Sequence, residues 1–245
     1  MARGRKSKRK KRVEEPVPPE QKPPIDQTTT TLDWESNWQE SRTIQEGQTD
    51  PKDSRCKLLK VGEPAAKATI GNGEMKLNGG SPRFYIMGQY QNVEFQSEIY
   101  AESNTEQLYL SARSNHERRP EGFGGYPLYI DVTEGSIFFK KEATHVIGYS
   151  SRLASVNVPS AKPNTWIRAK VSITNIESNK VKCEAWVNDT YTSFIDSGHI
   201  KCGDQSNTSP FTGIGESCFF RVNSSGEKGT ASVAVRYRNA KITKK

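Results

Sequence analysis

Short β-rich runs separated by turn signals at close intervals constrain this chain more than any other feature of its sequence. The turn strings are GNGE (71–74), NGG (78–80), EGFGG (121–125), TEG (133–135), NIESNK (175–180) and SSGEKG (224–229). The β-rich runs include NVEFQSEIYAE (92–102), QLYLSARS (107–114), YPLYIDV (126–132), TWIRAKVSIT (165–174) and ASVAVRYRNAKI (231–242). Many short strands with regular turns and no helical repeat are typical of an antiparallel sandwich. The sequence therefore predicts an all-β protein built from two antiparallel sheets.

Two of the runs alternate apolar and polar residues, as a half-buried strand does because successive side chains point to opposite faces. In residues 166–173 the apolar positions are 167, 169, 171 and 173, which leaves Arg168 and Lys170 on the other face. In residues 181–187 the same alternation leaves Lys182, Glu184 and Trp186 outside. The turn NIESNK joins the two runs as a hairpin. We therefore expect an indole beside cations on an open sheet face, which is a candidate ligand platform.

The first twelve residues, MARGRKSKRKKR, carry eight basic side chains and no acidic one. They are Arg3, Arg5, Lys6, Lys8, Arg9, Lys10, Lys11 and Arg12. Removing these eight from the 36 Lys+Arg leaves 28, which equals the 28 Asp+Glu, so the remainder is formally neutral. Residues 1–31 contain almost nothing that a core can bury. We predict a disordered basic and proline-rich arm over 1–31 and one folded domain over 32–245.

A cationic arm of this kind binds polyphosphate by counterion release without reading its sequence. The first 33 positions contain no aromatic residue, so the arm offers no surface for base stacking. Nucleic acid or another polyanion is therefore a candidate partner of the arm. A solubility tail, a nuclear-localisation signal, and a ribosome or membrane-surface contact are alternatives.

The basic start is followed by VEEPVPPEQKPP rather than by an apolar run, so no Sec-type signal peptide is expected. No apolar stretch approaches the length of a transmembrane helix. We expect a protein that stays inside a cell or a particle. The four cysteines are widely spaced without a C-x-x-C pair, which favours free thiols over a zinc site or a disulfide scaffold. No cofactor is predicted, and the sequence leaves a structural Ca²⁺ open.

Four strings resemble, in this order, strands of the concanavalin A-like lectin/glucanase superfamily of jelly-roll sandwiches. They are NVEFQSEIY (92–100), NTWIRAKVSI (164–173), VKCEAWVNDT (181–190), similar to a strand with a W-x-N-G turn, and VAVRYRNAKI (233–242), similar to the last strand. The resemblance covers roughly residues 32–245 and implies a concanavalin A-like jelly roll. The superfamily includes sugar-binding modules, glycoside hydrolases and polysaccharide lyases, so it implies a carbohydrate ligand without choosing an activity.

Retaining hydrolysis is not expected from this sequence. The retaining glucanases of the superfamily carry an E-x-D-x-E strand because two carboxylates about 5 Å apart must act together. This chain has no such string, and Glu94 and Glu98 lie about 13 Å apart along an extended strand. The lyase strands R-x-E-x-R, Q-I-H and Y-x-K-x-G-x-Y are not intact either, although their residue types are present.

A polar cluster between residues 113 and 149 supplies the parts that uronate lyase chemistry needs. That chemistry takes a cation for the carboxylate, a base for the neighbouring proton and an acid for the departing oxygen. The candidates are Arg113 or Lys141 for the cation, His116 or His145 for the base, and Tyr126 or Tyr149 for the acid. One hairpin, YIDV-TEG-SIFFKK, suggests that His116, Arg118, Tyr126, Glu142 and His145 converge. The alternative is a polar loop and a strand end without a ligand.

We predict carbohydrate binding on the sheet face that carries Trp186, Lys182, Glu184, Arg168 and Lys170, with Tyr126 and Glu142 at its rim. A structural capsid-type protein is the alternative, because a basic arm followed by one jelly roll resembles the layout of small icosahedral capsid proteins. An enzyme is the third hypothesis, and a polysaccharide lyase then fits better than a retaining hydrolase.

Overall fold

The computed structural model describes residues 30–59, 65–80, 82–102, 105–114, 124–143, 148–202, 208–224 and 233–245. Every regular element in these ranges is a β-strand, and every strand pairing is antiparallel. The strands form two large sheets and one small one. The prediction of an all-β sandwich of two antiparallel sheets is confirmed.

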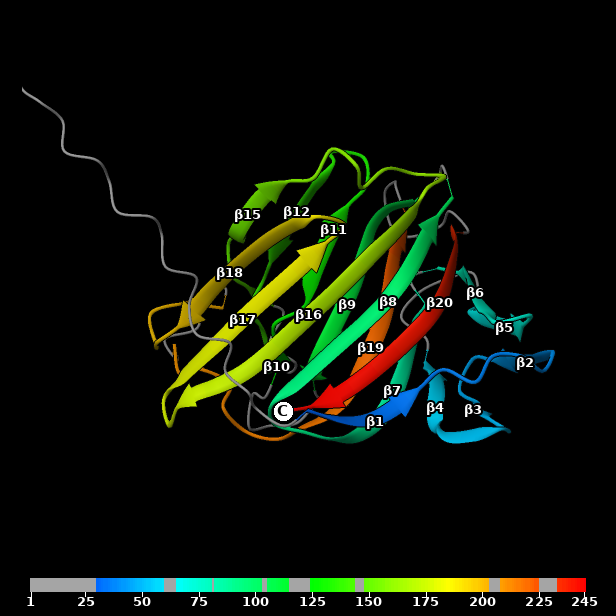
Figure 1. The fold of residues 1–245 in the computed structure, drawn as a ribbon, viewed down its shortest axis with the longest axis horizontal. Coiled ribbons are helices and arrows are strands. Elements are labelled where there is room, and N and C mark those ends of the chain that lie inside the picture. Colours follow the sequence, from blue (N-terminus) through cyan, green and yellow to red (C-terminus); the bar gives the residue numbers. More distant parts are fainter. Residues whose placement is uncertain are drawn as a thin grey trace, which may run out of the picture.

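The larger sheet has nine strands and lies in front in Figure 1, where β17, β16, β8 and β20 cross the view. Its order is β18 (Thr190–Asp196), β17 (Lys180–Val187), β16 (Trp166–Glu177), β8 (Val93–Ala101), β20 (Val233–Lys244), β6 (Glu74–Gly79), β5 (Lys67–Gly71) and β2 (Arg42–Gln45), with β1 (Thr31–Glu35) also paired to β20. The predicted hairpin of 165–187 is β16 with β17.

The second large sheet has eight strands, of which β9 and β19 lie behind the first sheet in Figure 1. Its order is β15 (Leu153–Asn157), β12 (Ser136–Phe139), β11 (Leu128–Asp131), β9 (Thr105–Ser114), β19 (Gly215–Ser224), β7 (Arg83–Tyr90), β4 (Asp53–Leu59) and β3 (Thr49–Asp50). The small sheet joins β10 (Gly124–Gly125), β13 (Glu142–Ala143) and β14 (Gly148–Tyr149). The second predicted hairpin is β11 with β12.

The core lies between the two large sheets and takes the inward side chains of both. Phe220 of β19 shows how they meet, because its ring lies 4.8 Å from that of Phe95 and 4.4 Å from that of Tyr237, both in the opposite sheet. The inward row of β16 is buried as its alternation predicted. All four cysteines are buried and keep their thiols, with no disulfide among them, as expected. No helix in the described ranges is long and apolar enough to cross a membrane.

A buried polar network ties the end of β18 to the eight-stranded sheet. The Lys141 ammonium lies 2.7 Å from Asp196 Oδ2 and donates to the carbonyl oxygens of Ile200, Thr208 and Ser209 at 3.1, 2.7 and 2.9 Å. The Tyr126 hydroxyl donates to the same Asp196 carboxylate at 2.6 Å. Because a buried charge is costly unless it is paired, this network fixes the segment that follows β18.

Candidate functional site

The outer face of the eight-stranded sheet, which is turned away from the core, carries rings at positions where a solvated strand carries polar side chains. In β9, for example, Tyr109 lies between the core residues Leu108 and Leu110. Each of these rings is at most 5% exposed. We call them the ring cluster, and its members are Tyr85, Tyr109, Tyr129, Phe138 and Phe219.

The strand register brings these rings into contact. Tyr129 is paired with Tyr109 on one side and with Phe138 on the other. The Tyr129 ring centroid lies 4.1 Å from that of Tyr109, and it stacks on Phe138 at 4.9 Å with an interplanar angle of 17°. Tyr85 and Phe219 form a second contact at 5.1 Å. Cross-strand aromatic pairs of this kind stabilise a sheet and leave a firm apolar floor.

Positively charged side chains lie over four of the five rings. The distances from charged atom to ring centroid are 4.9 Å for Lys140 over Tyr129, 4.3 Å for Arg152 over Phe138, 4.9 Å for Arg221 over Tyr109 and 6.0 Å for Arg83 over Phe219. The ring quadrupole attracts each cation. Because the rings are nearly covered, a ligand that approaches this face meets the cationic groups first.

Two of these cations face each other across neighbouring strands. Arg83 of β7 and Arg221 of β19 are directly paired across the strands. Within the part of the chain that the structure describes, neither guanidinium has a carboxylate oxygen within 4.0 Å. The Nε atoms of both are buried and have no hydrogen-bond partner among the residues that the structure describes. Like charges directly opposite on a sheet are destabilising. An anion bound between the two arginines would remove that repulsion.

Glu142 is a carboxylate that is hydrogen-bonded to the ring cluster. It lies in β13 of the small sheet and accepts from the Tyr129 hydroxyl. Burial, together with the negative charge of Glu142, raises the pKa of Tyr129, so the phenol keeps its proton at neutral pH. Burial also lowers the pKa of Lys140, although Glu142 opposes this change. Glu142 was predicted at the rim of the Trp186 face, but the structure places it at the ring cluster.

The outer face of the nine-stranded sheet carries Trp186, Lys182, Glu184, Arg168 and Lys170, with the outward orientation that the alternation predicted. Trp186 is paired directly with Lys170, whose ammonium lies 4.0 Å from the ring. Tyr191 of β18 is 47% exposed and lies 5.1 Å from the indole. This is the predicted arrangement of an indole among cations.

Charges on this second face are paired within the protein. The distances between charged atoms are 3.4 Å for Lys170 and Glu94, 2.8 Å for Lys182 and Glu184, 2.7 Å for Arg238 and Glu98, 3.4 Å for Arg236 and Glu74, and 3.3 Å for Arg168 and Asp189. Burial would raise the pKa of Glu98, but hydrogen bonds from Asn239 and Arg238 outweigh it and lower the pKa. Each of these five cations therefore has a carboxylate partner, and Glu94 also pairs with Lys245 at 3.6 Å.

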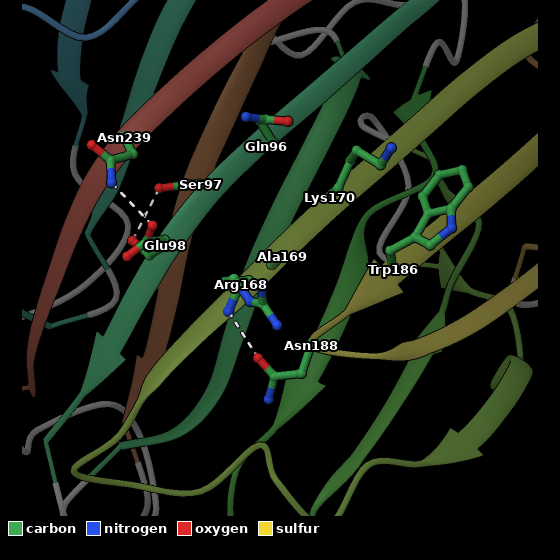
Figure 2. A pocket seen from close by; sticks show the side chains of 9 residues that line it. All are labelled: Gln96, Ser97, Glu98, Arg168, Ala169, Lys170, Trp186, Asn188 and Asn239. Carbon is green, nitrogen blue, oxygen red and sulfur yellow. Dashed lines mark hydrogen bonds between the residues drawn. The ribbon is translucent and has the colours of Figure 1, made fainter.

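A shallow pocket of about 230 Å³ lies on this face between β8, β16 and β17. Figure 2 shows Trp186 and Lys170 standing at one side of it, with Arg168 and Asn188 below and Glu98 and Asn239 at the other side. Glu94 and Glu98 share the outward face of β8, as expected, with separate ion pairs.

Three residues predicted for the polar cluster are buried between or beside the sheets. Arg113 is 1% exposed, and its guanidinium donates to the carbonyl oxygens of Gln91 and Phe211 and to Asn175 Oδ1 at 2.7, 2.6 and 2.5 Å. Lys141 and Tyr126 belong to the Asp196 network. All three make interactions that hold loops in place. Tyr126 and Trp186 are not brought together, since the former is in the core and the latter on an outer face.

The structure does not describe the side chains of the remaining predicted residues. His116, Arg118 and His145 are outside the described ranges, and of Tyr149 only the strand backbone in β14 is described. The arm residues Arg3 to Arg12 are outside as well. The predicted convergence of the two histidines, the lyase roles and the polyanion-binding arm therefore stay predictions. In the described segments, no group of three His, Cys, Asp or Glu side chains is arranged to hold a metal.

The ring cluster was missed at the sequence level, although the sequence contains its signal. The runs LYL, LYI, IFF and CFF each place a ring at the position where alternation calls for a polar side chain. One strand with a ring at such a position is common, whereas four strands that each have one predict an aromatic outer face. The opposed arginines had no comparable signal, because their pairing depends on the register of β7 with β19.

Comparison with solved structures identifies the fold. The chain is similar to a mutant of SCLam, a non-specific endo-β-1,3(4)-glucanase from family GH16, with TM-score 0.57, 10% identity, and coverage of 89% of this chain and 96% of that one. It is also similar to a Bacillus licheniformis β-glucanase, with TM-score 0.53, 9% identity, and coverage of 83% and 98%. A lichenase derived from a mouse hindgut metagenome gives TM-score 0.53, 6% identity, and coverage of 83% and 98%.

The fold is therefore a concanavalin A-like jelly roll, as the resemblance of the strand strings implied. No protein-family model matches the chain. No curated protein matches it either. The likeness in structure is accompanied by very low sequence identity, so it defines the fold, and function has to be argued from the residues on the two faces.

Proposed function

We propose that this protein binds acidic polysaccharide, and that the carboxylates of the glycan dock on the outer face of the eight-stranded sheet. The observation that carries the proposal is the directly opposed pair Arg83 and Arg221, which lacks an acidic partner in the described chain. A guanidinium binds a carboxylate through two parallel hydrogen bonds, and such charge-assisted bonds are stronger than neutral ones.

The ring cluster supports the same function by positioning the cations. Arg221 lies over Tyr109 and Lys140 over Tyr129, so these cationic groups are spread along a row of touching rings. A planar guanidinium stacked on a ring loses less freedom when it binds a ligand than one that is free in solvent. A uronate polymer carries repeated carboxylates, and a row of fixed cations matches repeated charge.

A nucleic acid is also a polyanion, but this face suits it less. Single-stranded nucleic acid is held by bases that stack on accessible rings. Here every ring of the cluster is at most 5% exposed, so a base has no free ring to stack on. The nucleic-acid hypothesis therefore concerns the predicted basic arm. The capsid-type hypothesis depends on the same arm. A carboxylate needs only the cationic groups, which favours an acidic glycan as the ligand of the domain.

The proposal is tested by affinity electrophoresis of the full chain in gels that contain polygalacturonate, alginate or a neutral β-glucan. We expect the uronate polymers to retard the wild-type protein and Arg221→Gln to lose most of that retardation. Arg168→Gln is the matched control, because it removes the same charge from the other face, where Arg168 is paired with exposed Asp189. Equal retardation of Arg221→Gln and wild type would refute the proposal. Ultraviolet absorbance of the same mixtures reads unsaturated product, which tests the lyase hypothesis separately.

A further inference from the structure

The pocket beside Trp186 lies on the outer face of the nine-stranded sheet, whereas the proposed uronate surface lies on the eight-stranded sheet. The pocket also differs in that its charged side chains are paired within the protein. We propose that it is a second and independent carbohydrate site, which takes one uncharged sugar residue. The inference goes beyond the proposed function, because it concerns another face and another ligand class. Trp186, Gln96 and Glu98 are the residues on which it rests (Figure 2).

The walls of this pocket are fixed by the hairpin of β16 and β17. Asn188 follows β17 with a φ of 52°, a left-handed conformation that Asn tolerates better than most residues. Its backbone N–H donates to the Arg168 carbonyl at 2.8 Å, and its side-chain oxygen accepts from the Arg168 N–H at 3.0 Å. The turn is therefore locked to the neighbouring strand, and Trp186, two residues earlier, projects from a rigid position.

The pocket combines an apolar wall with planar polar groups, which is the combination that a pyranose needs. Trp186 is half-buried, with Lys170 over its ring, and supplies the apolar wall. The Gln96 amide makes no hydrogen bond to the described residues, so it is available both to donate and to accept. Glu98 is held in one orientation by Arg238 at 2.7 Å and Asn239 at 3.0 Å. Few and well-placed polar groups around an apolar wall are typical of small-ligand sites.

Charge and size narrow the ligand class. The three charged side chains of the pocket are already paired, Arg168 with Asp189, Lys170 with Glu94 and Glu98 with Arg238. An added carboxylate would gain little from cations that already have carboxylate partners and would be repelled by Glu98, whereas a hydroxyl only adds hydrogen bonds. The volume of 230 Å³ is below the lower limit of about 300 Å³ that is usual for pockets of larger ligands. One neutral sugar residue, such as a chain end, fits both limits.

The test is saturation-transfer NMR of the full chain with glucose, galactose, mannose and xylose, each alone, and with glucuronate. We expect at least one neutral sugar to bind, and Trp186→Ala to weaken that binding by at least about threefold. Trp186→Phe keeps a ring and should retain part of the binding. Arg221→Gln is the control on the opposite face, and it should leave neutral-sugar binding unchanged.

Gln96→Leu is a second variant for the case that Trp186→Ala does not fold. Gln96 lies on the outer face of β8, so the substitution should leave the core intact and weaken binding of the same sugar. The proposal is overturned if no neutral sugar binds the wild type, or if folded Trp186→Ala and Gln96→Leu bind as wild type does. These outcomes are separate from the uronate test. If Arg221→Gln loses uronate binding but no neutral sugar binds the wild type, only the proposed site beside Trp186 is refuted. If a neutral sugar binds but Arg221→Gln keeps its uronate binding, only the proposed uronate surface is refuted.

Discussion

The two outer faces of the sandwich follow the same alternation of strands but differ in how their charges are satisfied. On the nine-stranded sheet, Lys182 with Glu184 and Arg238 with Glu98 exemplify a surface that pairs its own charges. On the eight-stranded sheet, Arg83 and Arg221 face each other above a floor of rings. A face that neutralises itself suits an uncharged ligand, whereas a face that leaves cations opposed needs an anion. Charge pairing therefore distinguishes the two proposed sites.

The largest effect on stability should come from the buried network of Lys141 and Asp196, which lies between the two outer faces. Asp196→Asn leaves the Lys141 ammonium buried with its charge uncompensated, since Asp196 is 0% exposed and Lys141 1% in their side chains. We expect the free energy of unfolding to fall by about 3–5 kcal/mol, measured by urea denaturation. Asp189→Asn is the control, because that carboxylate is 95% exposed and pairs at the surface. A stability of Asp196→Asn equal to that of Asp189→Asn would mean that the network is not structural.

Removing both opposed arginines should separate binding from stability. Arg83→Gln combined with Arg221→Gln should weaken binding of a uronate polymer by at least about 1.5–3 kcal/mol, or roughly 10- to 100-fold, measured by calorimetry. The unfolding free energy should stay the same or rise slightly, because like-charge repulsion is relieved. Lower stability with unchanged affinity would show that the pair serves the fold instead of a ligand.

Salt should act on one face only. The Debye screening length falls to about 3 Å at 1 M ionic strength. Uronate binding should therefore weaken steadily as the sodium chloride concentration is raised. Neutral-sugar binding beside Trp186 should hardly change over the same range, since its charges are paired within the protein. Parallel loss of both ligands in a salt titration would contradict the difference between the faces.

The smallest effect concerns Glu98. Its pKa is lowered in the folded protein, because hydrogen bonds from Asn239 and Arg238 outweigh the effect of burial. A carboxyl with a lowered folded pKa stabilises the fold above its unfolded pKa and loses that contribution as the pH falls through the folded pKa. Glu98→Gln should therefore be slightly less stable than wild type at pH 7, and the two should converge as the pH falls below the lowered pKa of Glu98. A difference that grows on acidification would reverse the sign and refute this account.

The strands and the Trp186 face could be predicted because they depend on local alternation. Residues 166–173 and 181–187 read as strands on their own, and their hairpin needs only a short turn. The partners of other strands could not be predicted, since β8 pairs with β20 and β9 with β19 across more than a hundred residues of sequence. The fold class therefore followed from the sequence, but the division of strands between the sheets did not.

The candidate sites were predictable only where one strand pair defines them. Trp186 beside Lys170 needs one hairpin and was predicted. Tyr126 and Glu142 were expected at the same groove, yet Tyr126 donates to buried Asp196 and Glu142 accepts from Tyr129 on the other sheet. Those positions depend on packing between layers, which the spacing of residues does not encode.

The most direct test is an NMR titration of the full isotope-labelled chain with a short oligogalacturonate, which reads the amides that shift. We expect the shifts to gather on β7, β19, β9 and β11, around Arg83, Arg221, Tyr109 and Tyr129, with no change around Trp186. Shifts centred on Trp186, or confined to the first twelve residues, would contradict the assignment of the acidic glycan to the outer face of the eight-stranded sheet.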